Sequence, residues 1–360
     1  MKKYVCLIWG IFFSLVSYSQ IDGPYIFHEG KSLRMIGTDH EGNINDTLIK
    51  KPSKNYLFTV HTQDGKQSFD VKLHPVTRPA WKTKQADKLF ITSDPHGNFN
   101  YFSTILKAGG VIDANFRWSF GKNHLVVIGD IFDRGGDVLP IFWLVYQLEQ
   151  EASEAGGQVS FLLGNHEELV MRNDVRYTKE SYKNLAQKLA IPYNALWTEN
   201  TELGYWLKNR NTMQVIGDNL FVHAGLSMDF LAKNLSIPVV NDTISHYLLH
   251  PKEKRNQSEL AKFLFSTDGP LWYRGMVRTE ESNHPIDKTE FNLILQKYGV
   301  NRIFVGHTIF TEITGFFGDK LIDVNVDNEE NSEKKRGRAL LIENNQIYLI
   351  YDSGKRIIRF

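Results

Sequence analysis

The sequence predicts an α/β protein: a partly parallel sheet flanked by helices, preceded by a small β-rich unit. Three short apolar runs, at residues 88–92, 125–128 and 159–163, have the length and composition of buried strands. Helix-like stretches at residues 99–108 and 137–151 separate these runs. Strands that alternate with helices form βαβ units, and the strands of such units run parallel.

Residues 1–19 have the layout of a secretory signal peptide. Two lysines are followed by an apolar run at residues 4–16, and Ser17 and Ser19 are the small residues at positions −3 and −1 of a cut before Gln20. The alternative is a membrane anchor, but the run is shorter than the roughly 20 residues that a spanning helix needs. We therefore expect cleavage and an exported chain, periplasmic or secreted, with no membrane span after cleavage.

Cysteine usage and charge exclude several classes of site and partner. The one cysteine, Cys6, lies inside the predicted signal peptide. The mature chain would therefore have no disulfide, no thiolate metal site and no cysteine nucleophile. The formal net charge is +1 over 360 residues. No basic block indicates a nucleic-acid partner, and nothing in the composition indicates an oligomeric state.

Residues 20–85 are expected to form the small β-rich unit. Runs at residues 56–60 and 68–73 are typical of strands, and glycine-containing turns separate such segments. Two prolines within residues 75–81 suit a joint between this unit and a larger domain over residues 86–360.

The rest of the larger domain is expected to add a helical stretch and more strands. The helical stretch covers residues 172–212, and a strand pair surrounds the turn at residues 217–219. Later strand-like runs lie at residues 302–305, 339–342 and 346–351. The charged segment from Asp327 to Arg338 is expected to be a solvated loop, because it has few apolar residues.

Each of the three strands in the βαβ region ends in a polar cluster. Asp94, Asp130 and Asn165 belong to these clusters and lie 36 and 35 residues apart, about one βαβ unit each. Because ligands bind outside the carboxyl ends of the strands in α/β sheets, we expect the three clusters to lie side by side there. Two later clusters, which contain His223 and His307, also follow apolar strands and should join them.

The residue types in these clusters predict a site for two divalent metal ions. Buried charges of one sign need a compensating cation, and oxygen and imidazole ligands without sulfur suit manganese, iron, zinc or magnesium. One ion would take Asp94, His96 and Asp130, and the other would take Asp130, Asn165, His223 and His307. Asp130 would bridge, since the first ion would otherwise lack ligands. Two cations roughly 3.5–4 Å apart form a clamp for phosphoryl transfer.

The motifs in these clusters resemble those of a known family. Asp-x-His-Gly begins at Asp94, Gly-Asp-x-x-Asp-Arg-Gly at Gly129, Gly-Asn-His-Glu at Gly164, His-Ala-Gly at His223 and Gly-His-Thr at Gly306. In this order they resemble the calcineurin-like metallophosphoesterases, and the motif at Gly129 resembles the phosphoprotein phosphatases (PPP) in particular. Stretches at residues 202–207, 220–226 and 269–275 are similar to the Shewanella-like phosphatases. The resemblance covers about residues 87–325.

The resemblance implies a fold, a reaction and roles for further residues. The fold is an α+β sandwich of mixed central sheets flanked by helices. A hydroxide that bridges the metal ions would attack a phosphomonoester in line, with His166 as the general acid, held by Asp133. Arg134 and Arg274 would bind the phosphate oxygens through their planar guanidinium groups, together with Asn165.

Some of these residues have simpler structural interpretations. Asp133 and Glu167 could hold the loop by hydrogen bonds alone, and Arg274 could be a surface arginine. His246 and His250 have the i, i+4 spacing of a helical metal pair. Because no acidic third ligand lies at a recognisable spacing, a surface helix is the better interpretation of that pair.

Three functions remain open. The leading one is metal-dependent hydrolysis of phosphomonoesters on protein side chains, with small phosphomonoesters as the other substrates and manganese as the expected metal. The second is hydrolysis of dinucleoside tetraphosphates, or broad-specificity phosphoesterase activity in the exported protein. The third, from another class, is a binding module in which the metal only stabilises the fold. The intact His166, Arg134 and Arg274 favour catalysis, because a structural metal site needs no general acid.

Overall fold

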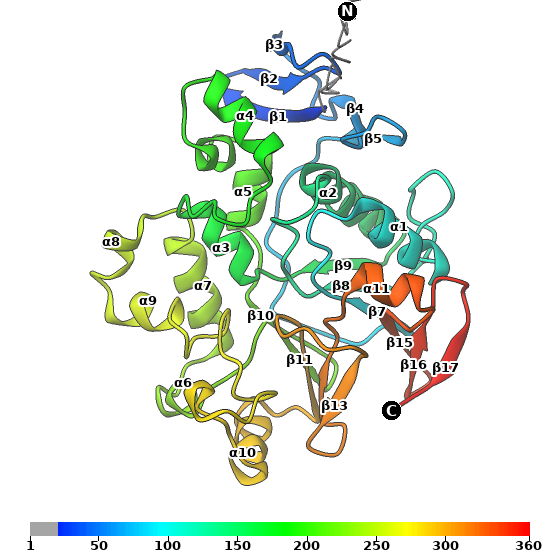
Figure 1. The fold of residues 1–360 in the computed structure, drawn as a ribbon, viewed down its shortest axis with the longest axis vertical. Coiled ribbons are helices and arrows are strands. Elements are labelled where there is room, and N and C mark those ends of the chain that lie inside the picture. Colours follow the sequence, from blue (N-terminus) through cyan, green and yellow to red (C-terminus); the bar gives the residue numbers. More distant parts are fainter. Residues whose placement is uncertain (1–20) are drawn as a thin grey trace, which may run out of the picture.

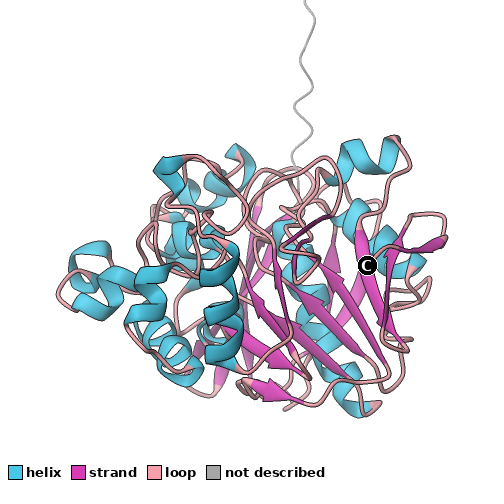
Figure 2. Cartoon of the chain, turned by 90° about the horizontal axis from the view of Figure 1, so that it is seen from below, coloured by secondary structure: helices cyan, strands magenta, loops and turns pink. Residues whose placement is uncertain are grey.

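The computed structural model describes residues 21–360, so the predicted signal peptide and Cys6 lie outside the described residues. Two six-stranded sheets form the centre of the molecule. Figure 2 shows the strands gathered together with helices around them. This arrangement confirms the predicted fold class of mixed sheets flanked by helices.

The first sheet contains the three predicted parallel strands. These are β7 (Lys88–Thr92), β8 (His124–Val127) and β9 (Gln158–Phe161), connected by α1 (Phe99–Ala108) and α2 (Val138–Glu154). Strand β15 (Ala339–Glu343) pairs antiparallel with β7. Strands β16 (Gln346–Ile350) and β17 (Arg356–Ile358) complete the order β17-β16-β15-β7-β8-β9.

The second sheet has the order β13-β14-β12-β11-β10-β6. Its strands are β13 (Thr314–Phe316), β14 (Leu321–Asp323), β12 (Arg302–Val305), β11 (Asn219–Val222), β10 (Met213–Ile216) and β6 (Lys82–Thr83). Strands β10 and β11 form the predicted pair around residues 217–219. Strand β6 directly follows the proline-containing joint and pairs parallel with β10, so it forms an edge strand of this sheet.

The two sheets pack face to face through apolar side chains. One buried cluster joins Leu89, Val126 and Ile128 of the first sheet to side chains of the second. Among these, the rings of Phe221 and Phe304 stack with centroids 5.0 Å apart. Because this face of the first sheet is covered by the second sheet, α1 and α2 pack on its other face. The strands are therefore buried on both sides, which accounts for their continuous apolar runs.

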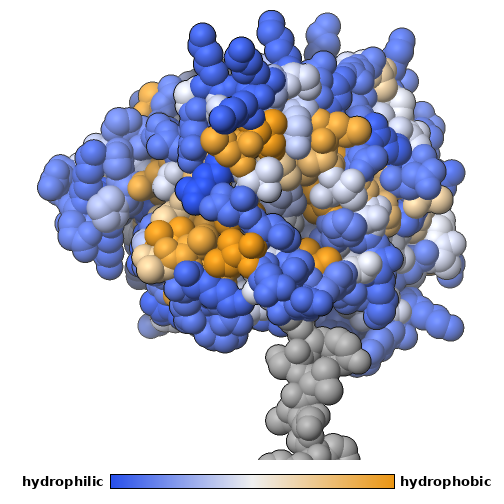
Figure 3. Space-filling view, turned by 90° about the horizontal axis from the view of Figure 1, so that it is seen from above, coloured by the Kyte–Doolittle hydropathy of each residue, from blue (hydrophilic) through white to orange (hydrophobic). Residues whose placement is uncertain are grey.

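The N-terminal unit is β-rich, as predicted. It contains the antiparallel sheet β1 (Asp22–Glu29), β2 (Ser32–Thr38) and β3 (Ile44–Lys50), and the hairpin β4 (Leu57–His61) and β5 (Ser68–Lys72). Figure 1 shows both at one end of the molecule, and Figure 3, which looks onto that end, shows apolar patches on a mostly hydrophilic face.

Aromatic contacts join the N-terminal unit to the larger part of the chain. The ring of Phe58 lies 4.9 Å from that of Trp143, and the ring of Tyr25 lies 5.7 Å from that of Trp197. The unit thus shares one hydrophobic core with the helices beneath it. The proposed boundary between residues 85 and 86 stays a prediction.

Short helices connect β9 to β10 and β11 to β12 along the chain. The predicted helical stretch contains α4 (Glu180–Lys188), a 3-10 helix (Tyr193–Trp197) and α5 (Glu202–Lys208). The sequence did not predict α3 (Asn165–Met171), α6 (Met228–Ala232), α8 (Lys252–Arg255), α9 (Glu259–Leu264), a second 3-10 helix (Glu281–Asn283) and α10 (Lys288–Tyr298). Helix α7 (Ile237–Tyr247) contains His246, one of the two histidines for which a surface helix was expected. Within residues 21–360, no helix is long and apolar enough to cross a membrane.

The expectation of a solvated loop from Asp327 to Arg338 is wrong. This segment contains α11 (Asn328–Glu333), and the Asp327 side chain caps the helix by accepting a hydrogen bond of 2.8 Å from the Glu330 amide. Arg338 is 1% exposed and donates to Asp352 Oδ1 and to the Tyr101 carbonyl at 2.8 and 3.0 Å. The polar composition was misleading because one capped turn and one buried, fully bonded arginine order the segment.

Candidate active site

The polar clusters that follow strands β7, β8 and β12 lie on tight, left-handed backbone turns. Positive φ angles occur at non-glycine residues throughout these turns: Asp94 (48°), His96 (41°), Asp130 (56°), Asp133 (71°), Arg134 (66°) and His307 (66°). Such conformations are costly for residues with a Cβ and concentrate at functional sites. At Gly129, a Cβ would lie 2.6 Å from His223 Nδ1, so only glycine allows the loop after β8 to approach that ring.

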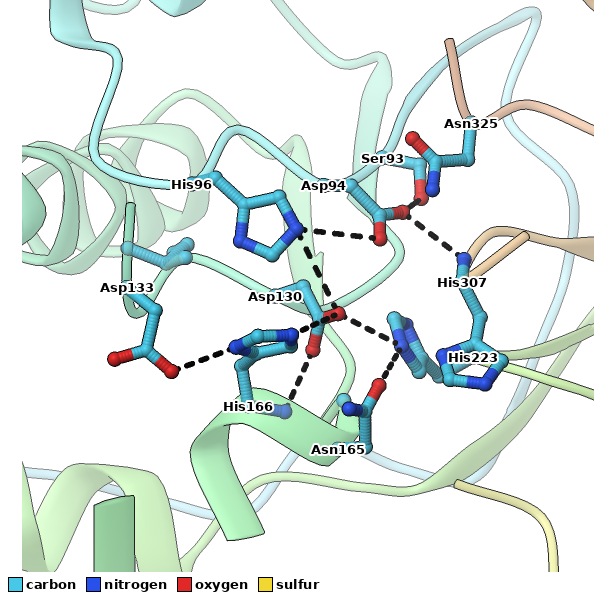
Figure 4. A network of polar contacts seen from close by, with 12 residues as sticks. Ser93, Asp94, His96, Asp130, Asp133, Asn165, His166, His223, His307 and Asn325 are labelled. Carbon is cyan, nitrogen blue, oxygen red and sulfur yellow. Dashed lines mark hydrogen bonds and ion pairs between the residues drawn. The ribbon is translucent and has the colours of Figure 1, made fainter. Parts of the chain in front are cut away.

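The first group of potential ligands surrounds the Nε2 atom of His96 (Figure 4). That atom lies 3.9 Å from Asp94 Oδ1 and 3.9 Å from Asp130 Oδ2. His96 Nδ1 faces the Phe132 carbonyl at 2.9 Å, which assigns the ring proton to Nδ1 and leaves Nε2 free to bind a metal. The structure therefore brings together the three residues predicted for the first ion.

The second group lies on the other side of Asp130. His223 Nε2 is 3.2 Å from Asp130 Oδ2 and 3.0 Å from Asn165 Oδ1, while its Nδ1 faces the Ile128 carbonyl at 2.9 Å. His307 Nε2 faces the Trp272 carbonyl at 3.1 Å, so its Nδ1 is the atom left for a metal. One cluster of ligand atoms within 4.8 Å of one another comprises Asp130, His223 and His307, and another comprises His96, Asp130 and His166. Asp130 belongs to both, which is the position that a bridging ligand would occupy.

Charge and burial make this donor set suitable for divalent cations. Asp94 is 3% exposed, its Oδ1 has no hydrogen-bond partner among the described residues, and burial raises its pKa to about 7. Burial lowers the pKa of His96 to about 3 and holds the pKa of His307 well below its usual value, so both rings are neutral. Neutral imidazoles beside buried carboxylates have lone pairs for a cation, and a cation would stabilise the carboxylates. The residues present therefore fit divalent metal ions.

His166 is oriented by a chain of hydrogen bonds. Its Nδ1 lies 2.6 Å from Asp133 Oδ2, and Asp133 Oδ1 accepts a bond of 2.7 Å from the Thr178 hydroxyl. This leaves His166 Nε2 pointing into the site, 4.0 Å from Asp130 Oδ2. Burial alone would lower the pKa of His166, but Asp130 and Asp133 more than offset it, so this pKa is raised. A protonated imidazole in this position can give a proton to a leaving oxygen.

Glu167 holds the loop after β8. Its buried carboxylate accepts hydrogen bonds from the amides of Gly164, Asp130 and Ile131 at 2.7, 2.9 and 2.9 Å. Glu167 thus holds the loop by hydrogen bonds, which was the simpler of the two interpretations of this residue in the sequence. Asp133 also bonds within the site, but its partner is the ring of His166.

The two predicted arginines lie at different parts of the site. Arg134 is exposed and lines a hollow of about 120 Å³ together with Asp94 and His96. Arg274 is half-buried and donates from Nη1 to the Thr308 hydroxyl at 2.9 Å and to the His307 carbonyl at 3.2 Å. Arg274 is therefore tied to the loop that carries His307 and is not a free surface side chain.

The structure adds residues to which the sequence assigned no role. The Ser93 hydroxyl donates to Asp94 Oδ2, and the ring of Tyr177 lies 5.4 Å from that of His166. Asp323, at the end of β14, is fully buried, and burial holds its pKa well above its usual value. The apolar run Leu321-Ile322 before Asp323 was a signal for this strand, but three residues are too few to stand out.

His246 and His250 remain apart from the site. Their rings lie 5.3 Å from each other, and His250 Nε2 lies 3.0 Å from Lys254 Nζ. Within residues 21–360, neither belongs to a cluster of three potential metal ligands. His246 lies on α7, as expected for a surface helix, whereas His250 lies beyond the end of that helix.

Comparisons with known proteins converge on one family. A family model described as calcineurin-like phosphoesterase matches residues 88–309. The crystal structure of the cold-active protein-tyrosine phosphatase of a psychrophilic Shewanella species is 32% identical, with a TM-score of 0.83 over 94% of this chain and 99% of that one. Shewanella-like protein phosphatase 2 of Arabidopsis thaliana is 26% identical over 76% of this chain and 78% of its own length. An uncharacterised protein of Schizosaccharomyces pombe is 31% identical over 63% of this chain and 68% of its own.

Proposed function

This chain belongs to the calcineurin-like phosphoesterase family, and from that premise we propose that it is a metal-dependent phosphatase that removes phosphate from phosphorylated protein side chains. The observation that carries this proposal is the pairing of His166 Nδ1 with Asp133 Oδ2 at 2.6 Å. That bond directs the other ring nitrogen toward the shared ligand Asp130. A binding module with a purely structural metal would need no such proton donor.

Each residue has a part in the reaction that its contacts support. His166 would donate its proton from Nε2 to the oxygen that leaves with the side chain, and Asp133 would keep the ring in that orientation. Arg134 and Arg274 would bind the phosphate oxygens, and Asn165 would assist them. Two divalent cations, manganese first and otherwise iron, zinc or magnesium, would neutralise the phosphate and lower the pKa of the attacking water.

Phosphotyrosine is the side chain that we propose first. The Shewanella protein of known structure is described as a protein-tyrosine phosphatase, and the fold similarity to it extends over nearly the whole chain. Phosphoserine and phosphothreonine are the substrates that we propose second, because the Arabidopsis relative is described only as a protein phosphatase. We also propose that the chain is exported after cleavage before Gln20, which N-terminal sequencing of the processed protein would test.

The test is phosphate release by residues 20–360 loaded with Mn²⁺. Matched phosphotyrosine and phosphoserine peptides would be compared with a small aryl phosphate and with diadenosine tetraphosphate. We expect the peptides to be cleaved faster than the dinucleotide, and His166→Ala to lose turnover while it keeps its metal. Faster cleavage of diadenosine tetraphosphate would replace the proposal with a nucleotide hydrolase. No hydrolysis of any substrate by the metal-loaded chain would favour the binding module.

A further inference from the structure

A second hollow lies beside the metal centre, between α3 and the pair α8 and α9. Its volume is about 480 Å³, which suits one or two amino-acid side chains rather than a water molecule. We name it the basic groove, because its lining includes four cationic side chains and two aromatic rings. These are Arg172, Lys252, Arg255, Lys262, Phe265 and Trp272.

Two of the four cations, Arg255 and Arg172, are already bound to other groups of the protein. Arg255 is 2% exposed, donates to the carbonyls of Tyr247 and Leu248 at 3.0 and 2.5 Å, and pairs with Glu168. Its guanidinium also lies 4.2 Å above the ring of Phe265. A buried arginine whose donors are satisfied in this way stabilises the shape of the groove and has few free N–H donors left for a ligand.

The charge of Arg172 is also compensated. It lies 3.1 Å from Glu168 and 3.0 Å from Asp174. Arg172 and Arg255 thus share the single carboxylate in the lining, that of Glu168. Within residues 21–360, the two lysines are therefore the cations of the lining that have no carboxylate partner.

Lys252 on α8 and Lys262 on α9 are exposed, and neither side chain forms an ion pair or hydrogen bond within residues 21–360. They stand on two different helices that both line the groove. Two unpaired ammonium groups over an aromatic wall attract a carboxylate more strongly than they attract a neutral or cationic side chain.

The basic groove is adjacent to the metal centre through Trp272. The Trp272 ring, which lines the groove, lies 5.9 Å from the ring of His307, and its carbonyl faces His307 Nε2 at 3.1 Å. Glu168 reaches the groove from α3, the helix that begins with Asn165 and His166. A polypeptide whose phosphorylated side chain enters the metal centre would therefore place a neighbouring residue in the groove.

The opposite side of the metal centre has more carboxylates than cations. The smaller hollow beside Asp94 is lined by the acidic residues Asp327 and Glu329 at the start of α11, and within the described part of the chain Arg134 is the one lysine or arginine in its lining. Figure 1 shows α8 and α9 on one side of α3 and α11 on the other. An acidic stretch of substrate would be repelled from the α11 side and attracted to the groove, so the charge pattern selects one direction.

We propose that the basic groove binds acidic side chains next to the phosphorylated residue of a protein substrate. The proposal rests on the proposed phosphatase function and adds the substrate class: phosphorylated segments with aspartate or glutamate within a few residues of the phosphate. Lys252 and Lys262 select the carboxylates, and Trp272 supplies the apolar wall. Neither lysine takes part in the chemical step.

The experiment compares two phosphopeptides that differ only in carboxylates and their amide equivalents. One peptide carries glutamates on both sides of the phosphorylated residue, and the other carries glutamines at the same positions. The enzyme variants are Lys252→Glu/Lys262→Glu and, as a matched control, Lys254→Glu, which changes an exposed lysine of the same helix outside the groove lining. A small aryl phosphate, which has no neighbouring residues to occupy the groove, measures the rate of phosphate hydrolysis alone.

For the unaltered chain we expect kcat/KM to be about three- to tenfold higher for the glutamate peptide, the range expected for one or two exposed ion pairs. The preference should shrink as salt is raised. The double variant should lose or invert the preference while hydrolysing the aryl phosphate normally, and the Lys254→Glu variant should keep the preference.

Two results would overturn the proposal in distinguishable ways. The unaltered chain could hydrolyse both peptides equally, or the preference could survive the double charge reversal. Either result would refute the proposed binding of acidic side chains in the groove and leave the phosphatase function intact. Hydrolysis of the aryl phosphate with no hydrolysis of either peptide would refute both the protein substrate and the groove.

Discussion

The two central sheets make different contributions to the same site. The first sheet supplies the carboxylates of Asp130 and Asp94 and the pair of His166 with Asp133, whereas the second supplies the imidazole rings of His223 and His307, which follow β11 and β12. Burial holds the pKa of His307 well below its usual value, whereas the neighbouring Asp130 raises the pKa of His223 to about 9. The comparison teaches that the carboxylates come from one sheet and two imidazole ligands from the other, so equivalent mutations in the two should fail differently.

The largest expected effect is that of Asp130→Asn, among the carboxylates of the first sheet. The amide keeps the size of the side chain but removes the charge shared by both ligand clusters. We expect metal content to fall below two ions per chain and activity to fall about a thousandfold or more. Metal analysis alongside phosphate release checks this. Two tightly held ions in the variant would contradict the bridging position.

His166→Ala separates proton donation from metal binding among the residues of the first sheet. We expect kcat to fall about 10²- to 10⁴-fold, because general acid catalysis is lost. Metal content should stay at that of the unaltered chain, since the predicted ligands are untouched. Loss of an ion from this variant would instead make His166 a ligand, as its place in the cluster with His96 and Asp130 allows.

His223→Ala tests the imidazole ligands of the second sheet. The lost ligand carries no obligatory negative charge, so we expect an activity loss of about a hundredfold that added Mn²⁺ partly restores. Asp130→Asn should show no such rescue. A titration of activity against Mn²⁺ for both variants gives the answer, and identical curves would break the proposed difference between the two sheets.

Asp133→Asn should change the pH profile more than the metal content. We expect kcat to fall about 10- to 100-fold, the usual range for a supporting residue. The Asp133 carboxylate helps to raise the pKa of His166, so its loss lowers that pKa and the protonated acid disappears at lower pH. The alkaline limb of the kcat profile should move to lower pH. An unchanged limb would show that another group limits the rate there.

The smallest effect is expected outside both sheets. Gln63, in the turn of the N-terminal hairpin, donates to the Ser181 hydroxyl at 2.7 Å, close to the residues that position Asp133. Gln63→Ala should cost about 1 kcal/mol of unfolding free energy for each hydrogen bond lost and lower kcat only a few-fold. Urea unfolding and steady-state rates check both values. A larger kcat loss at unchanged stability would give the N-terminal unit a direct part in catalysis.

The sequence predicted the first sheet better than the second for a physical reason. Strands β7 to β9 are apolar runs separated by the long helices α1 and α2, so periodicity identifies them to within a few residues. Strands β13 and β14 have three residues each, and α6, α8 and α9 have four to six, too short for a period to appear.

The candidate site was easier to predict than its surroundings. Its ligands directly follow strands, and their side chains have few roles other than binding a cation, so pattern and chemistry agree at Asp94, Asp130 and His307. Asp323 and the basic groove depend on packing between segments far apart in the sequence, such as α3 with α9. No local pattern records contacts of that kind.

The pairing of β15 with β7 has a consequence for folding during synthesis. Strand β7, which leads to Asp94, has β8 on one edge, but its other edge pairs with residues 340–343, which are synthesised long after it. Until then the nascent chain has an open, apolar strand edge, which invites aggregation unless a chaperone holds it. For the export that we propose, the same delay would keep the polypeptide unfolded long enough to pass through a narrow translocation pore.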